Sequence, residues 1–218
     1  MTHPFLAGGN IWVGEKRCLR TLSVAERGGL EALFGNRHSD DLRRFARDEA
    51  DFTRRTLMHV EAGKRDIIRG NTPEGRKMLS WALDGELVQE DEVALRRELH
   101  RFFVNVARDA KGRSQGLEID AIEVAAELIT PIDREAAVRL MQTAANLHAV
   151  RRCHEEAGRH YQIIAYLLKR DEPERAKEAA RAAVSEYREA AKTSNERKME
   201  LMEAKAQDLV QTYGLGGN

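Results

Sequence analysis

Residue types that bind metal ions gather most densely between positions 148 and 160. His148, Cys153, His154, Glu156 and His160 all fall in this stretch, and imidazole, thiolate and carboxylate groups are the usual ligands of zinc. On a helix Cys153, Glu156 and His160 would share one face, because they are spaced by threes and fours. No second ligand cluster of clear spacing accompanies them. We therefore interpret the stretch as polar helix surface and keep a metal site at Cys153, Glu156 and His160 as an alternative.

A second set of residues could bind phosphate groups. Arg43, Arg47, Arg54 and Arg65 fall on related faces of one expected helix, residues 43–69, and guanidinium groups bind phosphates well. Acidic residues interleave with these arginines, so ion pairs within the helix account for the pattern more simply. The whole chain carries 36 basic and 36 acidic residues. A nucleic-acid-binding role is therefore an alternative that the composition does not favour.

Catalytic motifs are not recognisable in the sequence. A glycine-rich phosphate loop is missing, and neither Cys18 nor Cys153 has a sequence context that would activate a thiol. The loop at Asp109–Asp120 places Lys111 and Arg113 where an EF-hand needs oxygen ligands. We expect a protein that is not an enzyme and that needs no cofactor.

The elements that would position these residues are helices. The chain has 218 residues, of which 33% are charged, 6% are aromatic and only 4 are proline, a composition typical of long helices. We expect an all-α fold with an N-terminal helical bundle followed by a long antiparallel helical hairpin. The expected parts are an arm (1–22), a bundle (23–129) and a coiled-coil-like hairpin (130–218).

Local signals delimit the helices of the bundle. Ser23 and Glu26 have the spacing of a capping box, Ser39 is an expected N-cap before a helix that runs to Arg69, and Thr72 is followed by Pro73. Gly63 is expected to bend or break the second of these helices. Apolar periodicity predicts two further helices, at 89–110 and 117–129.

The expected hairpin begins at Thr130 and Pro131, which read as a cap and a first helical turn. Apolar residues then recur every three or four positions up to Leu168, which predicts one continuous helix. Gly158 lies within this pattern and is expected to admit a close partner helix. A turn at 171–174 reverses the chain, so each arm would have about 40 residues and a length of about 60 Å.

Near the turn, apolar side chains cover more than half of the helix circumference, which is wider than one partner helix can bury. The N-terminal bundle could cover the remainder, but we expect another protein chain to do so, in a homo-oligomer or a larger assembly. The expected interaction residues are Leu147, Tyr161, Ile163, Ile164, Leu167 and Leu168.

The expected function is a non-enzymatic interaction or assembly protein that acts through self-association or a protein partner. Two distant cysteines do not form a disulfide framework, the N-terminal segment does not read as a signal peptide, and no apolar run is long enough to span a membrane. We therefore expect a cytoplasmic location and no membrane contact. The nucleic-acid and metal-binding roles stay as alternatives.

Overall fold

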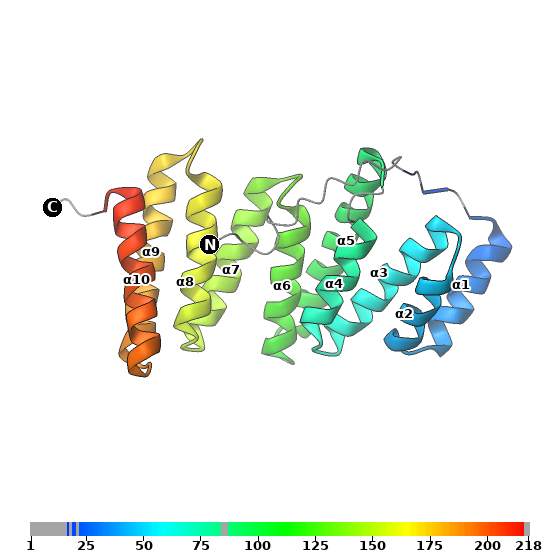
Figure 1. Ribbon diagram of the computed structural model, residues 1–218, viewed down its shortest axis with the longest axis horizontal. Coiled ribbons are helices and arrows are strands. Elements are labelled where there is room, and N and C mark those ends of the chain that lie inside the picture. Colours follow the sequence, from blue (N-terminus) through cyan, green and yellow to red (C-terminus); the bar gives the residue numbers. More distant parts are fainter. Residues whose placement is uncertain (1–16, 18, 21, 84–86, 216–218) are drawn as a thin grey trace. The chain divides into compact units, whose positions relative to one another are not determined.

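A computed structural model describes residues 17, 19–20, 22–83 and 87–215. These residues form ten α-helices and no β-strand, so the predicted all-α class is confirmed (Figure 1). Contacts divide the chain into two compact units, Met1–Arg96 and Arg97–Asn218. Within the described part, no helix is both long and apolar enough to cross a bilayer. Most of the predicted arm, residues 1–16, 18 and 21, lies outside the described residues.

Unit 1 contains four helices and the first turns of a fifth. They are α1 (Val24–Asn36), α2 (Ser39–Asp48), α3 (Phe52–Ile68), α4 (Thr72–Leu83) and α5 (Gln89–Ala110), whose later turns belong to unit 2. The bounds of α5 are those predicted from the sequence. The helix predicted from Ser39 to Arg69 is divided, because the backbone is extended at Glu49 and Asp51, and Asp51 caps α3 by accepting from the Arg54 amide at 2.9 Å.

The two helix starts predicted from serines have different outcomes. Ser23 caps α1, and both hydrogen bonds of the capping box with Glu26 are present. Ser39 is instead the first residue of α2, and its buried hydroxyl donates to the Asp66 carboxylate at 2.6 Å. The prediction for Ser39 was wrong because a buried carboxylate on α3 competes for the hydroxyl group.

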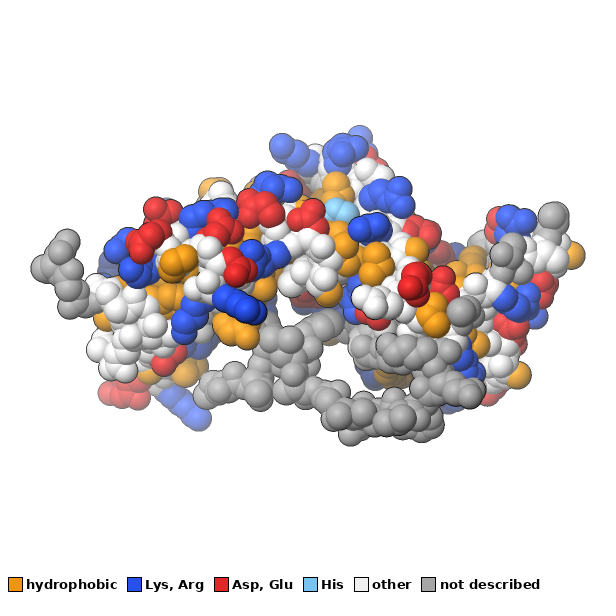
Figure 2. Space-filling model, turned by 90° about the horizontal axis from the view of Figure 1, so that it is seen from above, with side chains coloured by type: hydrophobic (Ala, Val, Ile, Leu, Met, Phe, Trp, Pro, Cys, Tyr) orange, Lys and Arg blue, Asp and Glu red, His pale blue; other side chains and the backbone are white. Residues whose placement is uncertain are grey.

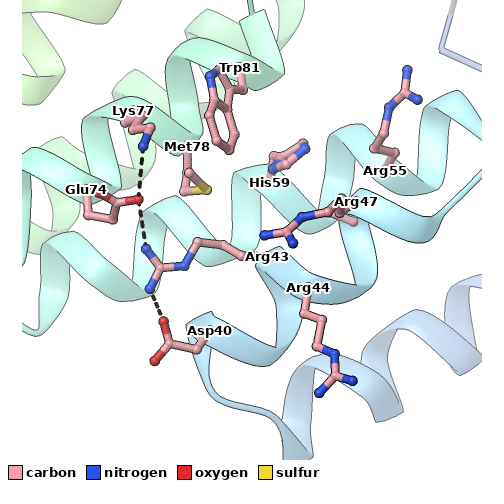
Figure 3. Close-up of a pocket in the computed structure, with 11 residues that line it drawn as sticks. Asp40, Arg43, Arg44, Arg47, Arg55, His59, Glu74, Lys77, Met78 and Trp81 are labelled. Atoms are coloured by element: carbon pink, nitrogen blue, oxygen red, sulfur yellow. Dashed lines mark hydrogen bonds and ion pairs between the residues drawn. The ribbon is translucent and has the colours of Figure 1, made fainter.

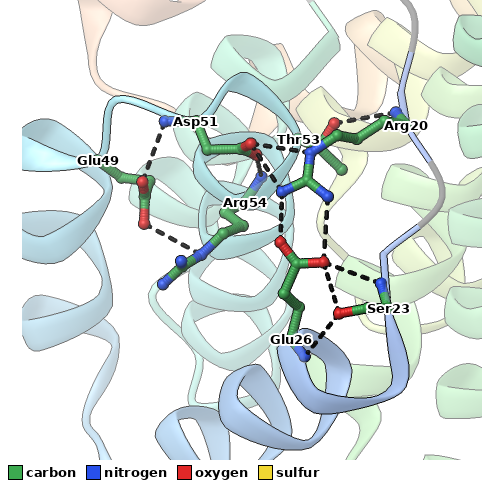
Figure 4. Close-up of polar contacts among 7 residues, drawn as sticks. All are labelled: Arg20, Ser23, Glu26, Glu49, Asp51, Thr53 and Arg54. Carbon is green, nitrogen blue, oxygen red and sulfur yellow. Dashed lines mark hydrogen bonds and ion pairs between the residues drawn. The ribbon is translucent and has the colours of Figure 1, made fainter.

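Arg20 connects the segment before α1 to the rest of unit 1 (Figure 4). Its guanidinium group forms ion pairs with Glu26 at 2.6 Å and with Asp51 at 2.8 Å, while its backbone amide donates to Thr53 at 3.0 Å. Glu26 also accepts from the amide and hydroxyl of Ser23. The hydrogen bonds from Arg20 lower the pKa of Glu26 to about 2. One cation therefore joins the start of α1 to the start of α3.

Helices α3 and α4 cross closely at a pair of glycines. A Cβ atom on Gly63 would lie 2.9 Å from the Gly75 carbonyl oxygen, and one on Gly75 would lie 2.8 Å from the Gly63 carbonyl oxygen. Gly63 thus neither bends nor breaks α3 but permits backbone contact with α4.

Unit 2 is a succession of helices in which each packs against the next along the chain (Figure 1). Connections of three or four residues separate them. The offset in sequence between the first residues of α6 and α8 equals the offset between the first residues of α7 and α9. Helices that are neighbours in the sequence are thus also neighbours in space. The helices are α6 (Gln115–Ile129), α7 (Arg134–Val150), α8 (His154–Leu168), α9 (Pro173–Lys192) and α10 (Glu196–Tyr213).

Each arm of the predicted long hairpin is thus two helices. Arg152 adopts a left-handed conformation (φ 59°), which ends the first arm after Val150, and Asn195 caps α10 after α9 has ended. Asp133, not Thr130, caps α7. The turn predicted near Asp171 is present, and it joins α8 to α9. The continuous apolar stripe misled the prediction, because consecutive packed helices bury the same periodic pattern as one long helix.

The core of unit 2 is built largely from alanine and branched aliphatic side chains. One cluster joins α6, α7, α8 and α9, and a second joins α9 to α10. Gly158 lies where α8 meets Tyr187 of α9, and a Cβ atom there would lie 2.8 Å from the tyrosine ring. The predicted close approach at Gly158 is confirmed.

Candidate functional site: a basic cavity in unit 1

A cavity of about 630 Å³ opens between α2, α3 and α4 (Figure 3). Ala46 and Met78, both fully buried, form apolar parts of its wall. Five basic side chains and two carboxylates share the lining, which therefore favours a negatively charged ligand. The lining residues are Asp40, Arg43, Arg44, Ala46, Arg47, Arg55, His59, Glu74, Lys77, Met78 and Trp81.

Arg43 is held in place by carboxylates on three helices. It pairs with Asp40 on its own helix, with Asp66 of α3 at 3.5 Å and with Glu74 of α4 at 3.0 Å. Burial alone would lower the pKa of Arg43, but these carboxylates raise it. The charge of Arg43 is therefore largely compensated, and its role is to hold the three helices around the cavity.

Arg44 and Arg47 carry the uncompensated positive charge. Both are exposed, and neither forms an ion pair with any residue that the structure describes. Their helix contributes Asp40 and Asp41 to its first turn, one turn before them. A planar guanidinium group on such a rim can bind a carboxylate or phosphate with two parallel hydrogen bonds.

An exposed aromatic ring, Trp81, lines the same cavity as these arginines. Trp81 is 53% exposed, with the Lys77 ammonium 5.0 Å from its ring centroid and the His59 ring edge-on to it at 5.5 Å. Burial lowers the pKa of His59, and the nearby charge of Arg55 lowers it further. The cavity thus offers an aromatic surface next to basic groups, which suits a ligand that combines an anion with an apolar or planar group.

Of the four arginines predicted to contact nucleic acid, Arg43, Arg54 and Arg65 form ion pairs within the chain. Only Arg43 and Arg47 line the cavity. Arg54 pairs with Glu49 at 3.2 Å, and Arg65 pairs with Glu61 at 2.8 Å and also donates to backbone carbonyls. Figure 2 shows basic and acidic side chains interspersed over the face that it presents.

The predicted interaction residues lie in or against the core of unit 2. Ile164 and Leu168 are each 2% exposed within the cluster that joins α6 to α9, while Tyr161, Ile163 and Leu167 are partly buried against it and Leu147 is half-buried. Consecutive helices of the same chain therefore cover most of this stripe.

The residues of the predicted metal site are not brought together. Cys153 precedes α8 and its thiol lies near the Arg151 carbonyl oxygen, Glu156 is exposed, and His160 is buried. His160 instead meets Glu123 of α6 and His148 of α7. Glu123 was missed, although a carboxylate on the apolar side of the 117–129 helix is a signal that a polar partner is buried with it.

Comparison with protein-family models, with curated proteins and with solved structures gives no match. The protein is therefore described by its fold and by the cavity of unit 1. It is an all-α protein with two units, one with a basic cavity beside an exposed tryptophan and the other built from sequentially packed helices.

Proposed function

We propose that the protein is a non-enzymatic helical interaction protein, and that the cavity of unit 1 binds an acidic segment of a partner protein that also carries an apolar or aromatic side chain. The observation that carries the proposal is the placement of Arg44 and Arg47, exposed and without ion pairs among the described residues, on the cavity that Trp81 lines. Carboxylates would pair with the guanidinium groups while the apolar side chain packs on the indole ring.

The cavity suits a short acidic peptide better than a nucleic acid. Nucleic-acid affinity depends on several phosphate contacts along a strand. Carboxylates of unit 1 form ion pairs with Arg43, Arg54 and Arg65. Among the four arginines predicted to contact nucleic acid, the positive charge without ion-pair partners in the described part of the chain is therefore confined to the cavity rather than spread along a strand-binding surface. The two carboxylates of the lining, Asp40 and Glu74, are likewise held by Arg43, and Lys77 approaches Glu74 at 3.7 Å.

The test uses the fluorescence of Trp81 in a full-length Trp12→Phe background, so that one indole reports. The probes are a peptide of glutamates around one phenylalanine, the same peptide with glycine in place of phenylalanine, a lysine peptide and a short single-stranded DNA. We expect saturable binding of the glutamate–phenylalanine peptide, weaker binding of the glycine peptide and none of the lysine peptide. Affinity should fall with salt, because the contacts are ionic.

Charge-reversal variants locate the site. Arg44→Glu with Arg47→Glu should abolish peptide binding, whereas Arg181→Glu with Arg188→Glu, also exposed and on α9 of unit 2, should leave it unchanged. If the DNA binds through Arg44 and Arg47 and the acidic peptide does not, the nucleic-acid role replaces this proposal. Peptide binding that survives the first double substitution would also contradict it.

Self-association is the second candidate from the sequence. The burial of Ile164 and Leu168 inside the chain leaves the exposed Tyr166, Val150 and Leu201 as large apolar groups on unit 2. The native mass in solution, measured against the 24.7 kDa of one chain, tests this candidate separately from the peptide titration. A monomer that binds the peptide would support the partner role alone.

A further inference from the structure

Three buried side chains with metal-binding groups meet inside unit 2, one from each of three consecutive helices. Glu123 of α6, His148 of α7 and His160 of α8 are 8%, 9% and 5% exposed. The Glu123 Oε1 atom lies 3.0 Å from His148 Nε2 and 2.8 Å from His160 Nε2. The two imidazole rings stack with centroids 5.4 Å apart and planes 17° apart. Two ring nitrogens and one carboxylate oxygen thus converge on one place.

We propose that Glu123, His148 and His160 bind a divalent transition-metal ion, and that Zn²⁺ is the ion that suits them. Their ligand atoms all lie within 4.8 Å of one another. Ligands placed tetrahedrally around a zinc ion with bonds of about 2.0–2.2 Å are separated by about 3.3–3.6 Å. Small side-chain rotations would therefore place an ion between the three atoms.

The ligand types select the ion. Imidazole nitrogen binds zinc and other late first-row metals well, whereas calcium and magnesium prefer sites built from oxygen ligands. Two histidines and one glutamate are a known ligand set of zinc, with a fourth position for water. This set shares only His160 with the one predicted from the sequence, and it does not use a thiolate.

Hydrogen bonds do not reach every polar atom of this cluster. Without an ion, both imidazoles can donate from Nε2 to the same carboxylate oxygen. The Nδ1 atoms of His148 and His160 are nevertheless buried without a hydrogen-bond partner. An ion bound at the two Nε2 atoms would leave these Nδ1 atoms as they are. Burying three ionisable groups next to alanine-rich helix faces nevertheless costs free energy, and coordination through Glu123 Oε1 and the two Nε2 atoms would offset part of that cost.

The ion would connect α6, α7 and α8. His148 and His160 flank the turn at Arg151–Cys153, where the left-handed Arg152 redirects the chain. A ligand that binds only the folded arrangement stabilises it. The site lies in unit 2 and does not depend on the peptide-binding cavity of unit 1.

The test starts from full-length protein stripped of metal by a chelator that is then removed. Zn²⁺ is added, and binding is measured by competition with a chromophoric chelator and by thermal unfolding. We expect one ion per chain and a melting temperature that rises by several degrees with Zn²⁺ and not with Mg²⁺. His148→Gln and His160→Gln should each weaken Zn²⁺ binding by at least about tenfold.

Two control variants separate this site from its neighbours. His154→Gln removes a half-buried histidine of α8 whose Nδ1 atom lies 2.7 Å from Glu186, and Cys153→Ser removes the nearby thiol. Both should retain Zn²⁺ binding. Zinc binding that is lost with Cys153→Ser or kept in His160→Gln would overturn the proposal, as would a wild-type chain that binds no Zn²⁺ at micromolar concentration.

A spectroscopic measurement on the wild-type chain keeps the test independent of how the variants fold. Co²⁺ bound to two imidazoles and a carboxylate should give visible ligand-field bands without a thiolate-to-metal charge-transfer band. A thiolate band would assign the ion to a cysteine, Cys18 or Cys153, and contradict the site.

Discussion

Among single residues, Glu155 of α8 joins two helices of unit 2 that are distant in sequence. Its carboxylate accepts from Lys198 at 2.8 Å and from Lys205 at 3.3 Å, both on α10. The hydrogen bond from Lys198 lowers the pKa of Glu155, burial opposes this shift, and Lys205 adds to the lowering. A carboxyl group whose pKa is lowered by folding stabilises the folded state above its unfolded pKa of about 4.5. That stabilisation is lost as the pH falls through the folded pKa.

We therefore predict that Glu155→Gln lowers the free energy of unfolding by about 0.5–1 kcal/mol at pH 7. The difference from wild type should shrink below pH 4.5 and vanish once the wild-type carboxylate is protonated. Urea unfolding at pH 7 and at pH 3 measures both values. Glu178→Gln, an exposed position on α9, is the control and should change neither. A deficit that is equally large at both pH values would show that packing of the side chain, not its charge, stabilises the contact.

Among the helices, the close contact between α8 and α9 requires a glycine, Gly158, where any side chain would meet Tyr187. Tyr187 is 1% exposed, its ring lies 2.8 Å from where a Cβ atom on Gly158 would be, and its hydroxyl donates to Gln162 at 2.7 Å. Burial raises the pKa of this hydroxyl to about 12. The ring is therefore fixed both by packing and by a hydrogen bond, and it cannot easily move away from an added methyl group.

We predict that Gly158→Ala destabilises unit 2 by about 1–3 kcal/mol, because the methyl group overpacks the helix contact. The matched control is Gly116→Ala in α6, where an added Cβ atom meets nothing within 4 Å. Alanine there should be neutral or stabilise by up to about 1 kcal/mol, since it reduces the entropy of the unfolded chain. Thermal unfolding of both variants compares the two effects, and equal losses would mean that the Tyr187 contact is not the cause.

For the whole molecule, the division between Arg96 and Arg97 predicts that unit 2 can fold without unit 1. Helices α6 to α10 each pack against the next in the chain, and proteins organised in this way derive stability from contacts between neighbours. Its core clusters join α6 to α9 and α9 to α10.

A fragment of residues 97–218 should therefore be helical and unfold cooperatively by itself. Circular dichroism at increasing urea concentration measures both properties. Under the metal-site proposal, the fragment should also retain the Zn²⁺ effect, because Glu123, His148 and His160 all lie within it. A fragment that is helical but melts without a cooperative transition would show that unit 1 is required for its packing.

Features set by neighbouring residues were predictable from the sequence. The capping box of Ser23 and Glu26, the bounds of the Gln89–Ala110 helix and the turn before Pro173 all follow from local hydrogen bonding or from apolar periodicity. Such signals act over three or four residues, so the tertiary environment rarely changes them.

Features that depend on contacts between distant residues were decided by the tertiary structure. The chain breaks at Arg152 without a glycine or proline, so the stripe from α7 to α8 read as one helix. Glu123 is separated from His148 and His160 by 25 and 37 positions, and Trp81 and the arginines of α2 line one cavity only because α2, α3 and α4 enclose it. Periodicity shows which face of each helix is apolar, but it does not show which helix covers that face. Both candidate sites depend on that packing, because each draws its residues from three helices.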